Sequence, residues 1–171
     1  VVGALLKVVE RDTELLVRCM ALESLGFSSC VKVQDIIEAA CQDGNEISLC
    51  SALRAMGRSY DADHWGNSIL EALTHSSVHV RLSAIYASRS LSFSAAVDEL
   101  LDLIYDPERD IQSAAVQALG EIGGKRARSA LIEIQAVAED DQELRELAEG
   151  ALENCELMNS IRNTRLFQSE S

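Results

Sequence analysis

The sequence predicts an all-α protein built from stacked helical hairpins, and three observations lead to this prediction. The chain of 171 residues is 47% hydrophobic but only 4% aromatic, with a single proline, a composition that favours helices over a sheet. No segment alternates polar and apolar residues with a period of two, as a half-buried strand would. Similar segments also recur every 31 to 33 residues, which is the pattern of a repeat protein.

Two sets of repeated segments define the hairpin. The ten-residue segments VRCMALESLG, SLCSALRAMG, VRLSAIYASR, IQSAAVQALG and, more loosely, LRELAEGALE begin at residues 17, 48, 80, 111 and 144. Each has an alanine where two helices would approach closely: Ala21, Ala52, Ala84, Ala115 and Ala148. Between them, DIIEAA, SILEAL, ELLDLI and ALIEIQ begin at residues 35, 68, 99 and 130. Each repeat is therefore a first and a second helix, and stacking the pairs buries their apolar stripes.

The expected elements follow in chain order. Helices are predicted over 2–11, 13–26, 29–42, 46–58, 62–75, 77–90, 93–105, 107–122, 125–139 and 141–156. The repeats then span 1–11 (partial), 12–43, 44–76, 77–106, 107–140 and 141–156 (partial), which form a single array over 1–156. Residues 157–171 lose the pattern and are expected to form a short terminal helix or a tail.

Helix ends carry their own signals. Asp106 followed by Pro107 predicts the start of a first helix, because Asp accepts from free amides and Pro suits the first helical position. Glycines stand where first helices end, and we expect left-handed caps there, at Gly26, Gly57, and Gly120 or Gly123.

The segment DPERDIQSAAVQALGEIGGKRARSALIEI (106–134) resembles a HEAT repeat of the short subgroup typified by the phycobilisome bilin lyases. The resemblance is recognisable in 12–26, 77–90 and 141–152 and faint in 46–57. It implies a right-handed α-α superhelix, an α-solenoid of about five hairpins, whose second helices line a concave face. It also implies that the repeated arginines, Arg18, Arg81 and Arg145, pair with acids of adjacent repeats; Gln112 and Leu49 replace arginine in the other two.

The net charge of −13 disfavours nucleic acid and anionic lipid as partners and favours a basic protein. Five cysteines, an odd number, are expected to be reduced thiols in a cytoplasmic protein rather than a disulfide framework. No apolar stretch is long enough to span a membrane.

The stretch LGEIGGKRARSAL (119–131) has glycines followed by basic residues, as a phosphate-binding loop does. A P-loop requires Gly five residues before Gly124 and Ser or Thr after Lys125, but Leu119 and Arg126 stand there. We therefore expect a glycine-capped turn. Its basic residues, Lys125, Arg126 and Arg128, are expected to contact acids of a neighbouring repeat.

Candidate partner-binding residues come from the second helices. One position is acidic in four consecutive repeats, at Glu38, Glu71, Asp102 and Glu133, with Asp98 and Glu99 nearby. Such a row either steers a basic partner into a groove or is an ordinary solvated surface. Trp65, the only tryptophan, is either an exposed interface anchor or a filler between repeats.

No catalytic site, cofactor or metal site is predicted. The three histidines, His64, His75 and His79, belong to no metal-binding motif, and no nucleophile has a convincing base. The leading hypothesis is therefore a non-enzymatic scaffold that binds a protein partner on the second-helix face. The alternatives are a subunit that handles bilins, as the resemblance suggests, and a regulatory segment of a larger signalling protein.

Overall fold

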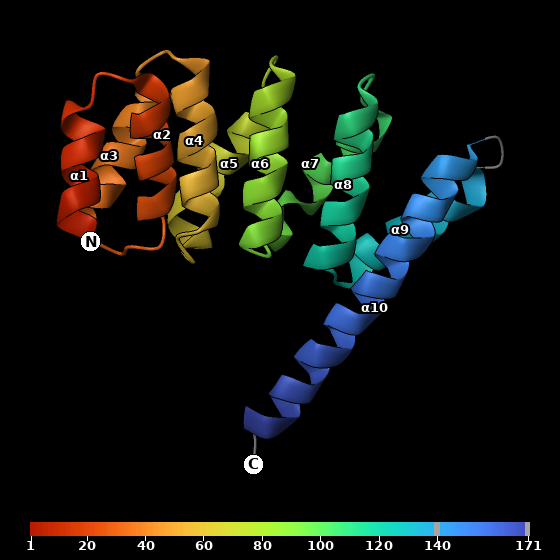
Figure 1. The fold of residues 1–171 in the computed structure, drawn as a ribbon. Coiled ribbons are helices and arrows are strands. Elements are labelled where there is room, and N and C mark those ends of the chain that lie inside the picture. Colours follow the sequence, from red (N-terminus) through yellow and green to blue (C-terminus); the bar gives the residue numbers. More distant parts are fainter. Residues whose placement is uncertain (139–140, 170–171) are drawn as a thin grey trace. The chain divides into compact units, whose positions relative to one another are not determined.

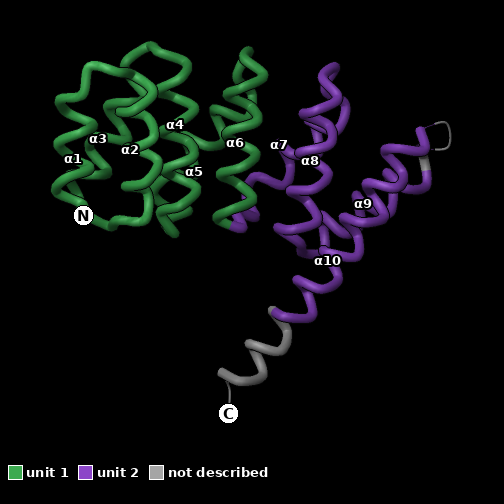
Figure 2. The backbone as a smooth tube through the Cα atoms, viewed as in Figure 1, with its two compact units in different colours: residues 1–91 green, residues 92–171 purple. Residues whose placement is uncertain are grey.

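The computed structural model describes residues 1–138 and 141–169, and every regular element in those ranges is helical. The all-α prediction is confirmed. The chain forms two compact units, residues 1–91 and 92–171 (Figure 2), and each is described by itself. None of the described helices combines the length and the apolar character needed to cross a bilayer.

The first unit contains α1 to α6. Their bounds are α1 (Val2–Arg11), α2 (Leu15–Leu25), α3 (Val31–Gln42), α4 (Glu46–Gly57), α5 (Ala62–Leu73) and α6 (Val78–Ser90). The first helices α2, α4 and α6 lie side by side, and the second helices α3 and α5 lie behind them (Figure 1). The repeated alanines Ala21, Ala52 and Ala84 are buried between these layers. A single helix cannot bury its own apolar flanks, so these flanks are removed from water only when the helices stack.

The second unit has the same layers. It contains η1 (Ser94–Ala96), α7 (Val97–Asp102), η2 (Leu103–Tyr105), α8 (Arg109–Ile122), α9 (Lys125–Val137) and α10 (Gln142–Ser169). The first helices α8 and α10 pack on each other, and α9 packs on both. Its core includes Ala115, Leu119, Leu131 and Ala148, all fully buried, and each large apolar side chain there contributes roughly 1.5–3 kcal/mol.

Glycines set the spacing between first helices. A Cβ at Gly26 would lie 2.9 Å from the Ala55 Cα, and one at Gly120 would lie 2.8 Å from the Ala151 Cα. Gly26 has a right-handed helical conformation, and Gly57 is the last residue of α4 and has no positive φ, so the expected left-handed caps are wrong at both positions. Gly123 and Gly124, which follow α8, have positive φ values of 68° and 95°. The repeated glycines therefore serve close helix packing, and one residue type at similar positions has two different roles.

Several helix boundaries differ from the prediction, among them those of three elements in the second unit. The expected helix 93–105 is divided into η1, α7 and η2, and it ends at Tyr105 because Asp106 before Pro107 is extended, with a ψ of 142°. The helix α8 begins at Arg109 rather than at 107; Asp106 accepts from the Glu108 amide at 2.9 Å in the turn before it. The helix α10 continues from Gln142 to Ser169, since no Gly or Pro follows Gly150 to stop it.

In α6, α8 and α10, the side chain at the repeated arginine position ties the helix to the turn before it. Arg81 donates to the His75 carbonyl at 2.9 Å, and Arg145 donates to the Ala138 carbonyl at 3.1 Å. Gln112, which replaces arginine, donates to the Asp106 carbonyl at 2.7 Å. A carbonyl near a helix end lacks an intrahelical donor, so arginine and glutamine satisfy the same need.

Candidate functional site

A groove lies between the second helices α3 and α5 of the first unit, and the first helix α4 forms its floor. Two cavities of about 240 and 280 Å³ make up this α3–α5 groove, and Cys41 and Ser68 line both of them. The floor is apolar because Leu49, Leu53 and Met56 of α4 face it. Leu49 occupies the repeat position where other first helices carry arginine or glutamine.

Two residues of the predicted acidic row lie on the rim of this groove. Glu38 of α3 lines the first cavity, and Glu71 of α5 lines the second. Both side chains are exposed. Glu38 also lies near His64 of α5, with 3.3 Å between the Glu38 Oε1 and the His64 Nε2. The groove therefore has one carboxylate on each wall, above an apolar floor.

Cys41 and Ser68 were missed by the sequence reasoning, although a signal existed. Cys41 follows Glu38 by three residues, and Ser68 precedes Glu71 by three. Residues three apart on a helix share a face, so the position of each acid predicts its neighbour. Only the pairing of α3 with α5 needed the structure.

The pKa of the Cys41 thiol reflects the electrostatic character of the groove. Its pKa is raised to about 11, chiefly because burial disfavours the thiolate and further because Glu38 and Asp43 are negatively charged. Burial disfavours any charge in the groove, whereas the negative charges of Glu38 and Asp43 favour a cation over an anion. The groove thus combines negative potential with partial exclusion of water.

Trp65 is not the exposed anchor that the sequence analysis considered. Its side chain is 2% exposed and lines the inner wall of the first cavity, with the His64 ring 4.3 Å away in an edge-on arrangement. Trp65 lies three residues before Ser68, on the side of α5 that faces α4, so its indole ring packs into the core. A partner could reach Trp65 only through the groove.

The remaining acids of the predicted set belong to the second unit and are not part of the α3–α5 groove. Asp98 forms an ion pair with Arg126. Glu99 is half-buried, and its Oε2 is enclosed without a hydrogen-bond partner among the described residues. Asp102 and Glu133 are exposed on α7 and α9. Asp98 and Glu99 are therefore less available to a partner than Glu38 and Glu71.

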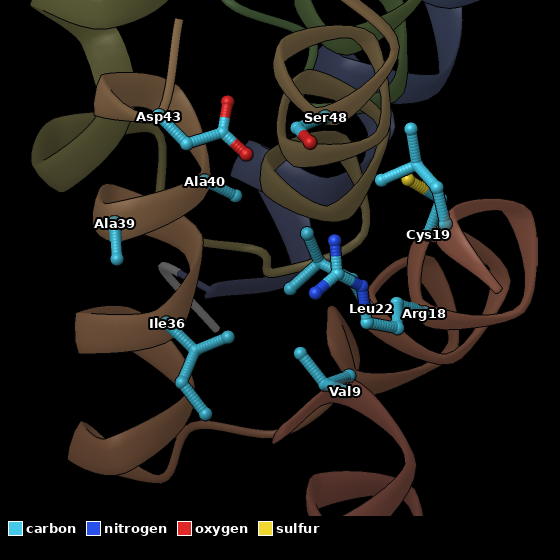
Figure 3. Close-up of a pocket in the computed structure, with 10 residues that line it drawn as sticks. Val9, Arg18, Cys19, Leu22, Ile36, Ala39, Ala40, Asp43 and Ser48 are labelled. Atoms are coloured by element: carbon cyan, nitrogen blue, oxygen red, sulfur yellow. The ribbon is translucent and has the colours of Figure 1, made fainter. Parts of the chain in front are cut away.

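A third cavity of the first unit, of about 230 Å³, is lined by one basic and one acidic residue, Arg18 and Asp43. Val9, Leu22 and Ile36 provide apolar walls, and the side chains of Arg18 and Asp43 point into the space between them (Figure 3). Residues of α1, α2 and α3 line the cavity, together with Ser48 of α4.

The glycine-rich turn does not hold a phosphate. Gly124 has a φ of 95°, and its amide donates to the Asn159 side chain of α10 at 2.9 Å. Arg126 pairs with Asp98 of α7, and Arg128 pairs with Glu156 of α10 at 3.1 Å. The prediction that these basic residues contact acids of neighbouring repeats is confirmed for Arg126 and Arg128. Within the described ranges, no cluster of three His, Cys, Asp or Glu side chains could hold a metal ion.

Comparisons with known proteins agree with the architecture. A family model described as HEAT repeats matches residues 66–153, more than half of the chain. No curated protein matches the sequence. The matched region covers hairpins of both units. Outside this region, Gly26 and Ala55 form the same close contact between first helices that Gly120 and Ala151 form within it. The repeats, their packing and the family match together show that the chain belongs to the HEAT-repeat family.

Proposed function

We propose that the protein is a non-enzymatic scaffold that binds a basic segment of a protein partner in the α3–α5 groove. HEAT repeats generally mediate protein–protein interaction. The observation that carries the proposal is the pair of adjoining cavities with Glu38 on one wall and Glu71 on the other.

The shape and lining of the groove suit lysine or arginine side chains. Such side chains bury an apolar stem and keep a charged head at a polar boundary. Here the stem would contact Leu53 and Met56, and the head would lie between the carboxylates of the rim. Cys41 and Ser68 line both cavities, so two basic residues of one segment could occupy them together.

The charge of the molecule supports the same class of partner. A net charge of −13 attracts basic proteins at long range and increases their association rate. The negative charges of this groove would repel an anionic ligand. The bilin alternative remains a hypothesis from the sequence resemblance, and the propionates of a tetrapyrrole would be repelled by Glu38 and Glu71.

Site-directed photocrosslinking tests the proposal in the source cell. A photoreactive amino acid replaces Ser68, which lies between the two cavities, and a matched variant carries it at the exposed Glu153 of α10. We expect a protein crosslinked from position 68 and not from position 153, with lysine or arginine at the crosslinked segment. Crosslinking from position 153 alone, or to an acidic segment from position 68, would contradict the proposal.

A further inference from the structure

The third cavity of the first unit, which we call the α1–α3 cavity, is built like the α3–α5 groove beside it. The second helices α1 and α3 form its walls and the first helix α2 forms its floor, just as α3 and α5 enclose the groove above α4. Each lining residue of the 280 Å³ cavity has a counterpart here, 31 or 32 positions earlier in the chain; Val9, Leu22 and Ala40 thus correspond to Cys41, Leu53 and Ala72. The two sites are therefore consecutive copies of one repeat site, with α3 as their common wall.

Burial sets the register between the two walls. Ile37 of α3 and Ile69 of α5 are 1% and 0% exposed, and they lie 32 positions apart. In this register Glu71 corresponds to Ala39, one position after Glu38. The α1–α3 cavity consequently has an alanine where the α3–α5 groove has one of its two rim carboxylates.

The floor of the α1–α3 cavity carries a positive charge where the neighbouring floor is apolar. Arg18 of α2 occupies the repeat position of Leu49 in α4, and its half-buried side chain points into the cavity (Figure 3). In α6 and α10 the equivalent arginines, Arg81 and Arg145, donate to carbonyls of the preceding turns. A guanidinium that is partly shielded from water by apolar walls is a strong site for a carboxylate, because solvent screens the pair less.

Asp43, at the other side of the cavity, determines which kind of carboxylate fits. Its side chain accepts from the Asn45 amide at 2.8 Å and also lines the cavity. A free anion would be repelled by Asp43 and by the net charge of −13. A carboxylate carried by a segment whose lysine or arginine lies in the α3–α5 groove brings its own compensating charge, so the repulsion is offset.

We propose that the partner segment bound in the α3–α5 groove continues across α3 into the α1–α3 cavity and places an aspartate or glutamate side chain against Arg18. The inference rests on the proposed function and adds an acidic residue to the basic segment. Packed helices lie about 8–10 Å apart, and an extended chain advances about 3.3 Å per residue. The acidic residue therefore stands about three positions from the nearest basic residue, and Arg18 determines the specificity for such a segment.

Synthetic peptides test this inference. One peptide carries two lysines and, three positions after the second, a glutamate; its control has glutamine in place of the glutamate, and the reversed sequences of both cover the two chain directions. Fluorescence anisotropy measures Kd for the wild type, for Arg18→Gln and for Arg54→Gln. The last variant makes the same change of charge at an exposed residue that lines neither site.

We expect the glutamate peptide, in one of the two directions, to bind the wild type about fivefold more tightly than its glutamine control. This advantage should disappear in Arg18→Gln and persist in Arg54→Gln. In Arg18→Glu, a peptide with lysine at the glutamate position should become the tighter ligand. This exchange of charges distinguishes a direct contact from a general loss of structure.

The results that contradict the inference differ from those that contradict the proposed function. A glutamine peptide that is weakened by Glu38→Lys with Glu71→Lys, but gains nothing from glutamate, overturns the inference alone. A glutamate advantage that persists in Arg18→Gln also overturns it. A glutamine peptide that does not bind, or binds equally to the Glu38→Lys, Glu71→Lys variant, contradicts the proposed function and the inference with it.

Discussion

The close contact between α8 and α10 makes a sharp prediction for a single methyl group. Gly120 faces Ala151, and a Cβ at position 120 would lie 2.5 Å from the Ala151 carbonyl oxygen and 2.8 Å from its Cα. Both atoms belong to the backbone, so no side chain can rotate to make room. In Gly120→Ala, the two helices must therefore separate by roughly 1 Å to restore ordinary van der Waals distances.

Two opposing terms set the magnitude. Alanine in a helix interior is favoured over glycine by about 1 kcal/mol. Overpacking a well-filled contact costs about 1–3 kcal/mol, and here the contact is between two backbones, which places it in the upper part of that range. The net expectation for Gly120→Ala is a loss of about 1–2 kcal/mol in the free energy of unfolding, or a fall in Tm of roughly 2–8 °C.

Gly150→Ala provides a matched control in the same pair of helices. A Cβ at Gly150 would have no atom within 4 Å, so only the helix propensity changes, and the free energy of unfolding should rise by up to about 1 kcal/mol. Urea denaturation followed by circular dichroism measures both variants. If Gly120→Ala were as stabilising as Gly150→Ala, the account of glycine as the spacer between first helices would be refuted.

Three further changes test local features. In Glu38→Gln, the pKa of Cys41 should fall below its value of about 11, because one of the charges that raise it is removed; the pH profile of Cys41 alkylation measures this, and an unchanged profile would contradict the assignment. The pKa of Asp141 is lowered to about 2, first by its hydrogen bond to Arg109, so its stabilising effect is present above pH 4 and is lost as the pH falls towards 2. Acid titration of unfolding should therefore show a smaller fall over that window in Asp141→Asn than in the wild type, and equal curves would exclude the linkage. Asn45 caps α4 by accepting from two backbone amides, so Asn45→Ala should lower the free energy of unfolding by about 1 kcal/mol in thermal melts, whereas no change would mean that the cap contributes nothing.

Much of the fold could be predicted because the repeat imposes the same constraint several times. Ala52, Ala84, Ala115 and Ala148 are all fully buried, as their common position predicts. The role of Gly26 could not be predicted, since a glycine at a helix end suggests a cap as readily as a close helix contact. The distinction depends on a backbone conformation and on a neighbour 29 residues away at Ala55.

The candidate site could be predicted only in part. The recurrence of an acid in second helices identified Glu38 and Glu71, but periodicity does not reveal which acids have neighbours of opposite charge. Asp98 is paired with Arg126, a contact between residues 28 apart in sequence. Trp65 illustrates the same limit, because its burial depends on how α5 packs on α4 rather than on its own helix.

The affinity of the crosslinked partner for charge-reversed variants tests the central claim most directly. The variant Glu38→Lys with Glu71→Lys reverses both walls of the α3–α5 groove, and Glu149→Lys with Glu153→Lys makes the same change in net charge on α10. With isothermal calorimetry at two salt concentrations, we expect the groove variant to raise Kd by about tenfold or more, equivalent to roughly 1.4 kcal/mol, and to weaken the salt dependence, while the α10 variant stays near the wild type. An unchanged Kd and salt dependence for the groove variant would contradict the account.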